Sequence, residues 1–69
     1  MKFSARNQLK GTVKAINEGA VNTEVVIEVA PGVEVVSIIT KGSSKSLGLA
    51  VGKTAYAMVK ASSVMIAVD

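Results

Sequence analysis

The chain has 69 residues, no Cys and no His, and a net charge of +3 from eight Lys and Arg against five Asp and Glu. A domain this short usually needs a disulfide, a metal or self-association for stability. The missing Cys and His exclude disulfides, thiolate and imidazole metal sites and His-based acid–base catalysis, so we expect self-association. The positive charge fits an anionic partner but is also common on solvated surfaces.

The first two predicted strands span residues 8–16 and 21–30. In the first, small apolar residues alternate with polar ones. In the second, one face carries Val21, Thr23, Val25, Ile27 and Val29. A period of two indicates strands with one buried face. Between them, Glu18 to Ala20 is a predicted turn in which Gly19 is free to adopt a positive φ.

A third strand is predicted at residues 33–41. It follows Pro31 and Gly32, and so short a connection favours an antiparallel hairpin with the second strand. It is apolar on both faces, which is expected in a covered sheet or at a subunit interface. After it, Ser43 or Ser44 is the predicted N-cap of one short helical turn, which Gly48 closes.

Two last strands are predicted at residues 54–60 and 63–68, after a turn at residues 51–53. Five short strands with one short helical turn between the third and fourth follow the order of an OB-like barrel. We therefore predict an all-β, five-stranded OB-like barrel that occupies residues 1–69 as a single domain. No run of 18 apolar residues and no signal-peptide core are present, which predicts a cytoplasmic protein without membrane segments.

Catalysis finds little support among the acidic and nucleophilic residues. Glu24 and Glu28 share the polar face of an amphipathic strand, where solvation explains them. No Ser has a His or Cys partner, although Ser–Lys pairs remain open. No ligand cluster for metal-assisted hydrolysis is evident. The chain is therefore predicted not to be an enzyme and to need no cofactor.

Three segments at predicted strand ends are rich in hydrogen-bond donors and contain no carboxylate: residues 4–8, 40–43 and 60–63. A tetrahedral oxyanion only accepts hydrogen bonds, so its site should consist of donors alone. Backbone N–H groups, Arg and Lys supply such donors together with charge. The same residues could equally cap turns and coat the surface.

Two further functions remain open on the residues alone. OB barrels often bind single-stranded nucleic acid by stacking bases on aromatic side chains, but only Phe3 and Tyr56 are aromatic here. A structural oligomer without a ligand is the other alternative. Titrations with single-stranded DNA and with anions separate these possibilities from oxyanion binding.

The order of these segments resembles the molbindin (Mop) family, small molybdate-binding proteins with a TOBE-type, OB-like domain. The opening octet Ser-Ala-Arg-Asn-Gln-Leu-Lys-Gly is the most specific part of the resemblance. It covers nearly the whole chain, in order, through residues 4–11, 20–26, 37–40 with Ser43, 47–49 and 57–65. Unlike several relatives, this chain is basic rather than acidic at residues 41–46, which leaves the donor pattern intact.

The resemblance implies a binder of molybdate or tungstate for storage, buffering or delivery. It implies a homo-oligomer, a hexamer built as a trimer of dimers with exchanged strands, and ligand sites at subunit interfaces. Regulators and importer ATPases also carry this module, but the chain lacks DNA-binding helices and an ATPase motif, so neither nucleic acid nor membrane is an expected partner. The ligands carried over are Ser4, Ala5, Arg6, Thr40, Ser43, Lys60, Ala61 and Ser62. A second site on the three-fold axis would involve residues 19–22.

Overall fold

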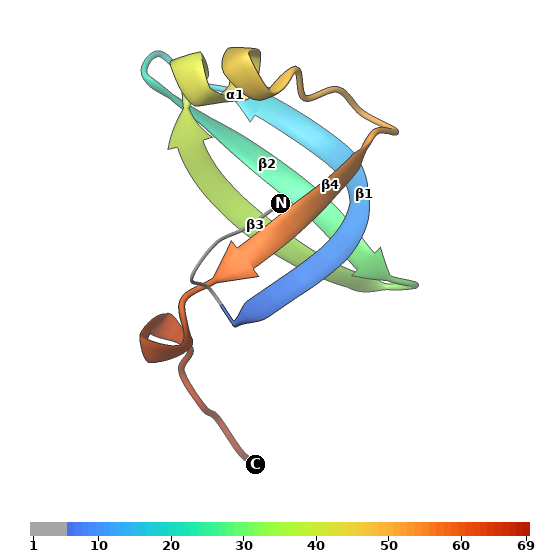
Figure 1. The fold of residues 1–69 in the computed structure, drawn as a ribbon, viewed down its shortest axis with the longest axis vertical. Helices are drawn as coiled ribbons and strands as arrows, with labels where there is room; N and C mark the ends of the chain where they lie inside the picture. The colour runs from blue at the N-terminus through green and yellow to red at the C-terminus, as the bar shows by residue number, and fades with distance from the viewer. Residues whose placement is uncertain (1–5) are drawn as a thin grey trace.

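A curled, open antiparallel sheet of four strands forms the body of the protein (Figure 1). The computed structural model describes residues 6–69. The elements are β1 (Asn7–Glu18), β2 (Asn22–Ala30), β3 (Val33–Thr40), α1 (Lys41–Leu47), β4 (Thr54–Val59) and a 3₁₀ turn (Ala61–Ser63). The strand order is β3-β2-β1-β4. The predicted all-β, OB-like class is therefore confirmed, with one helix between the third and fourth strands.

The curl arises because β1 pairs with two different neighbours along its length. Its first half, Asn7 to Thr12, pairs with β4, and its second half pairs with β2. At the change of partner, Lys14 is an extra residue in a β-bulge, which bends a strand and increases its twist. Val13 bonds there to the turn before β4, its N–H donating to the Lys53 carbonyl over 2.9 Å.

Gly11 permits β1 and β2 to cross closely at this bend. A Cβ at Gly11 would lie 2.4 Å from the Glu28 carbonyl oxygen and 2.7 Å from Ile27 Cγ2. Neither distance is compatible with a side chain, and one obstacle is backbone, which cannot rotate away. The bend therefore requires glycine for space rather than for a positive φ.

The core lies on the concave face of the sheet. Val13, Val25, Ile27 and Ala57 are buried, and partly buried side chains such as Ile16, Val35 and Ile39 pack against them. The predicted inward face of the second strand is confirmed at Thr23, Val25 and Ile27. Thr23 is fully buried, and within residues 6–69 its hydroxyl has no hydrogen-bond partner.

Two predictions about turns and caps are wrong. Positive φ occurs, among the described residues, at Gly32, Gly48 and Gly52, and not at Gly19. The turn at Gly19 leaves no space for a side chain, because a Cβ there would lie 2.9 Å from the Asn22 carbonyl oxygen. The N-cap of α1 is Thr40 rather than Ser43 or Ser44, whereas Gly48 closes the helix as predicted, with φ 63°.

The predicted fifth strand is absent from the structure. After the 3₁₀ turn, residues 64–69 form no secondary structure and run away from the sheet (Figure 1). The exposed fractions of Met65, Ile66 and Val68 are 92%, 86% and 90%. A strand needs a hydrogen-bonded neighbour, and this segment has none among residues 6–69. The barrel consequently stays open, with β3 and β4 as its edges.

The third strand is apolar on both faces, as predicted, but its outer face has no cover within residues 6–69. Val35 and Ile39 pack against the core, but the alternate residues Val36 and Ile38 are 59% and 62% exposed on the outer face. Exposed β-branched side chains on an edge strand mark a surface suited to association.

No helix of the described part is long and apolar enough to cross a membrane.

Candidate functional site

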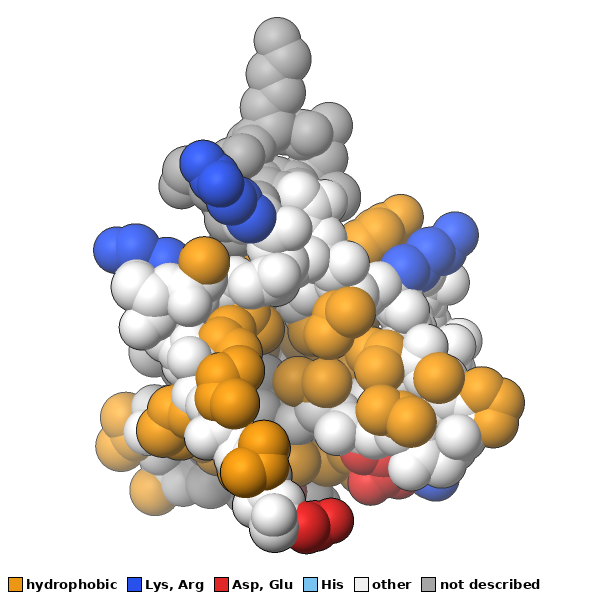
Figure 2. Space-filling model, turned by 90° about the horizontal axis from the view of Figure 1, so that it is seen from below, with side chains coloured by type: hydrophobic (Ala, Val, Ile, Leu, Met, Phe, Trp, Pro, Cys, Tyr) orange, Lys and Arg blue, Asp and Glu red, His pale blue; other side chains and the backbone are white. Residues whose placement is uncertain are grey.

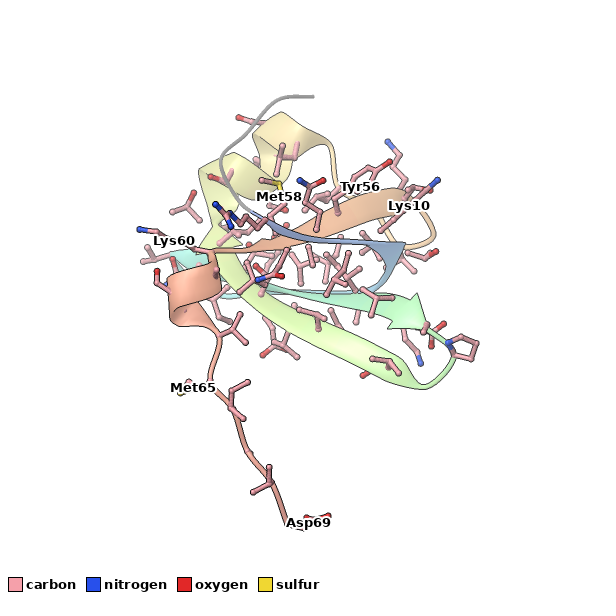
Figure 3. All side chains as sticks on the ribbon, turned by 60° about the horizontal axis from the view of Figure 1, so that its bottom comes forward. Lys10, Tyr56, Met58, Lys60, Met65 and Asp69 are labelled. Carbon is pink, nitrogen blue, oxygen red and sulfur yellow. The ribbon has the colours of Figure 1, made fainter. Side chains whose placement is uncertain are left out.

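One group of candidate donors lies where β1 begins and β4 ends, a region termed here the β4 end. Asn7 pairs with Val59, so Arg6 and Lys60 lie just beyond the last pair of the two strands. Both side chains are exposed. Figure 3 shows Lys60 at the start of the 3₁₀ turn that follows β4. The other predicted members of this group, Ser4 and Ala5, lie outside the described residues.

The 3₁₀ turn adds two backbone donors to the β4 end. Ser63 N–H donates to the Lys60 carbonyl over 2.8 Å, and Val64 N–H donates to the Ala61 carbonyl over 3.3 Å. The first N–H groups of any helical turn have no acceptor inside it. Those of Ala61 and Ser62 accordingly find no acceptor within residues 6–69. This arrangement leaves them available to an anion.

The second group lies where β3 ends and α1 begins, termed here the α1 end. Thr40 has extended backbone angles, φ −73° and ψ 155°, and caps the helix. Its Oγ1 accepts from the Ser43 N–H over 3.0 Å and donates to the Ser43 Oγ over 2.9 Å. Because this bond uses the hydroxyl proton of Thr40, the hydroxyl proton of Ser43 is left as a donor at this end.

The structure brings together the described residues of each group but not the two groups. The β3 arrow ends at α1, while the β4 arrow points to the opposite end of the molecule (Figure 1). Arg6 therefore lies near Lys60 and the 3₁₀ turn, and Thr40 lies near Ser43. One small tetrahedral ion cannot contact both groups within one chain.

The carboxylates of β2 and β3 have partners on the outer face of the sheet. Lys14 Nζ lies 3.2 Å from Glu28 Oε2 and 2.9 Å from Glu34 Oε2, and Asn17 donates to Glu24 Oε1 over 3.1 Å. The hydrogen bond that Lys14 donates to Glu34, followed by the one that it donates to Glu28, raises the pKa of Lys14 above its ordinary value. The acidic side chains of β2 and β3 are thus already paired.

An apolar cleft between the edges of β3 and β4 escaped the sequence analysis. Its volume is about 370 Å³. The lining comes mainly from β4, with further residues from β2, β3, the end of α1 and the segment after it, and comprises Val25, Ile27, Ser37, Ile39, Leu47, Leu49, Thr54, Ala55, Tyr56 and Met58. The sequence signal that could have revealed the cleft was the predicted fifth strand. If that strand does not pair within the chain, the barrel is open along one side.

The comparisons with known proteins agree with this architecture. The TOBE domain profile matches residues 4–66. The chain is 49% identical, over the full length of both, to the "Probable molybdenum-pterin-binding protein" of Haemophilus influenzae. The structure of MopII from Clostridium pasteurianum superimposes with a TM-score of 0.90 at 45% identity, covering 97% of this chain and all of that one.

A third relative is a solved complex with its ligand. The cytoplasmic molybdate-binding protein ModG, with molybdate bound, superimposes with a TM-score of 0.83 at 48% identity. The alignment covers 88% of this chain and 43% of the ModG chain.

The open four-stranded sheet and the match over residues 4–66 define a TOBE domain. More narrowly, the chain belongs to the molbindin (Mop) family, whose members named above are molybdate-binding or molybdenum-pterin-binding proteins.

Proposed function

We propose that this chain binds molybdate, and also tungstate, at sites built from two copies of the chain. The observation that carries the proposal is the pair of donor groups at opposite ends of one sheet, each without a carboxylate in its segment. A dianion that only accepts hydrogen bonds matches such a site. The name of ModG as a molybdate-binding protein supports the choice of ligand.

Each predicted ligand has a definite role in this proposal. Arg6 and Lys60 compensate the negative charge, and charge-assisted hydrogen bonds are stronger than neutral ones. The Ser43 hydroxyl and the N–H groups of Ala61 and Ser62 bind further oxygens. Ser4, the Ala5 N–H and Thr40 complete the set.

The assembly is a homo-oligomer, proposed to be a hexamer arranged as a trimer of dimers. Two surfaces support self-association. The cleft between β3 and β4 is apolar, and the tail that follows β4 exposes Met65, Ile66 and Val68. A second copy whose tail fills this cleft would give both surfaces a partner and would complete the open barrel.

The physiological role that we propose is storage, buffering or delivery of molybdate in the cytoplasm. The chain acts as a single domain over residues 1–69 and as a binder rather than an enzyme. Binding of single-stranded nucleic acid is the weaker alternative, because Tyr56 is the sole aromatic residue of the described part and the strands offer no row of stacking side chains.

Calorimetric titration with molybdate, tungstate, sulfate and phosphate tests the proposal. We expect molybdate and tungstate to bind and phosphate to bind much more weakly. Every inorganic phosphate ion keeps at least one proton at pH 7, because its second ionisation only separates a monoanion with two protons from a dianion with one. A site of donors alone offers that proton no acceptor, which costs about 1–3 kcal/mol. Molybdate and sulfate are both fully deprotonated at pH 7, so the site must reject sulfate by size.

Two outcomes would contradict the proposal. Equal affinity for phosphate and molybdate at neutral pH would exclude a site made only of donors. Absence of heat with every oxyanion, together with saturable binding of single-stranded DNA, would favour the nucleic-acid alternative.

A further inference from the structure

Positively charged side chains at the β4 end and at the α1 end lack carboxylate partners among the described residues. Arg6 and Lys60 lie at the β4 end, and Lys41 and Lys45 lie on α1 at the other end. None of the four forms an ion pair within residues 6–69, whereas Lys14 contacts two carboxylates. Both ends therefore carry positive charge that the chain itself does not neutralise.

The apolar surface lies next to this charge. Figure 2 looks at the β4 end and shows hydrophobic side chains over much of the face, with Lys and Arg side chains at its margin. Burial of the apolar surface favours association. The cations of two copies oppose it wherever the β4 end of one copy approaches the α1 end of another, because like charges repel.

We infer, building on the proposed function, that a tetrahedral dianion removes this repulsion, so that oxyanion binding and self-association form one coupled equilibrium. A ligand that binds only the assembled state stabilises that state by mass action. Coupling of this kind is reciprocal, so the affinity for the anion also rises with protein concentration. The protein would thereby assemble more tightly when its ligand is abundant.

The effect of salt has an unusual sign in this account. Interfaces held by surface ion pairs weaken as salt screens attraction. Here screening acts on a repulsion, so neutral salt strengthens association of the ligand-free protein. In the presence of molybdate, salt has the opposite effect, because it screens the attraction between the anion and the cations.

Sedimentation equilibrium of the full chain over a dilution series tests the coupling. The series is run with and without molybdate in NaCl of about 0.01 M and about 1 M, where the Debye length is about 30 Å and about 3 Å. We expect molybdate to lower the dissociation concentration at least tenfold at low salt. Without molybdate, the dissociation concentration should be lower at high salt than at low salt.

Two Lys variants separate charge from structure. Lys60→Gln should assemble more tightly than the wild type without ligand, and molybdate should no longer shift its dissociation. Lys10→Gln is the matched control, because Lys10 is an exposed residue of β1 that pairs with Tyr56, inside the strand rather than at its end, so the variant should leave both behaviours unchanged. Circular dichroism checks folding, and Arg6→Gln repeats the test if Lys60→Gln does not fold.

The failures of the inference and of the proposed function are distinguishable. Calorimetric binding of molybdate without any shift in dissociation would overturn the coupling and leave the function standing. Weaker ligand-free assembly of Lys60→Gln, or of the wild type at high salt, would overturn the repulsion. Absence of molybdate binding at every protein concentration would overturn the proposed function itself.

Discussion

The β1–β2–β3 region and the region formed by β4 and the tail differ in how many of their apolar and polar groups have partners within the described residues. In the first, the strands are paired, three of the four buried apolar residues are found, and the carboxylates of Glu24, Glu28 and Glu34 have partners. In the second, an apolar cleft is open, the tail is exposed, and cations and N–H groups lack acceptors among the described residues. The first region satisfies most of its polar and apolar groups within the chain, whereas the second leaves apolar surface and donors without partners among the described residues.

Removing a cation from the β4 end should have the largest effect, and it should affect binding rather than folding. An enclosed dianion that loses one charged partner typically loses about 2–5 kcal/mol. We expect Lys60→Ala and Arg6→Ala to weaken molybdate binding at least about tenfold, which corresponds to about 1.4 kcal/mol. Titration of each variant and thermal melts with and without molybdate measure this.

The control for these variants is Lys14→Ala, because Lys14 lies on the outer face and contacts only Glu28 and Glu34. Molybdate should raise the melting temperature of the wild type and of Lys14→Ala much more than that of Lys60→Ala. Wild-type affinity in Lys60→Ala would refute the role assigned to Lys60.

Gly11→Ala should damage the first region directly. A Cβ would meet the Glu28 carbonyl oxygen at 2.4 Å, so β1 and β2 must move apart at the bend. Overpacking of this kind costs about 1–3 kcal/mol or more. Gly42→Ala is the control, since a Cβ there lies 4.0 Å from Thr40 Oγ1 in an open helix position and should stabilise the protein slightly. Equal chemical denaturation midpoints for both variants would contradict the steric account.

Thr23→Val should stabilise the ligand-free protein. The Thr23 hydroxyl is fully buried and has no partner within residues 6–69, and an unsatisfied buried polar group costs about 1–3 kcal/mol. Valine has nearly the same shape and removes that cost. Denaturant unfolding measures the change, with the exposed Thr54→Val as the control. A destabilised Thr23→Val would mean that the hydroxyl has a partner in the assembled protein.

The smallest expected effect concerns Lys14 and alkaline pH. Its contacts with Glu34 and Glu28 raise its pKa in the folded protein. A raised pKa contributes stability below the unfolded-state value, and this contribution is lost as pH rises through the higher folded value. The difference in melting temperature between wild type and Lys14→Met should therefore disappear at strongly alkaline pH. The same difference for Lys10→Met, which has no ion pair among the described residues, should not change in this way.

The sequence predicted most of the first region because its signals are local. Alternation along the second strand identifies the buried face at Val25 and Ile27, and Pro31-Gly32 identifies the hairpin. The bulge at Lys14 and the crowding at Gly11 depend on the change of partner along β1, which no local pattern encodes. The N-cap was misplaced because Thr40, Ser43 and Ser44 are all good caps and differ only in backbone angles.

The second region was predicted less well for a physical reason. Residues 63–68 have the composition of a strand, but a strand exists only with a neighbour, and the described part of the chain supplies none. The candidate ligands were found as donor segments without carboxylates, but their separation onto opposite ends follows from strand direction. Within residues 6–69, the sequence indicated the candidate donors but not their division between the β4 end and the α1 end.

The central claim is that each ligand site takes one half from each of two copies, and a mixing experiment tests it most directly. Lys60→Ala removes a cation from the β4 end, and Ser43→Asp adds a repelling carboxylate to the α1 end, so neither variant alone should bind molybdate well. The two are unfolded together and refolded. Random mixing should then restore roughly one intact site in four, detected as binding of near wild-type affinity by calorimetry. If the refolded mixture binds no better than either variant alone, the two halves do not come from different copies, and the account is wrong.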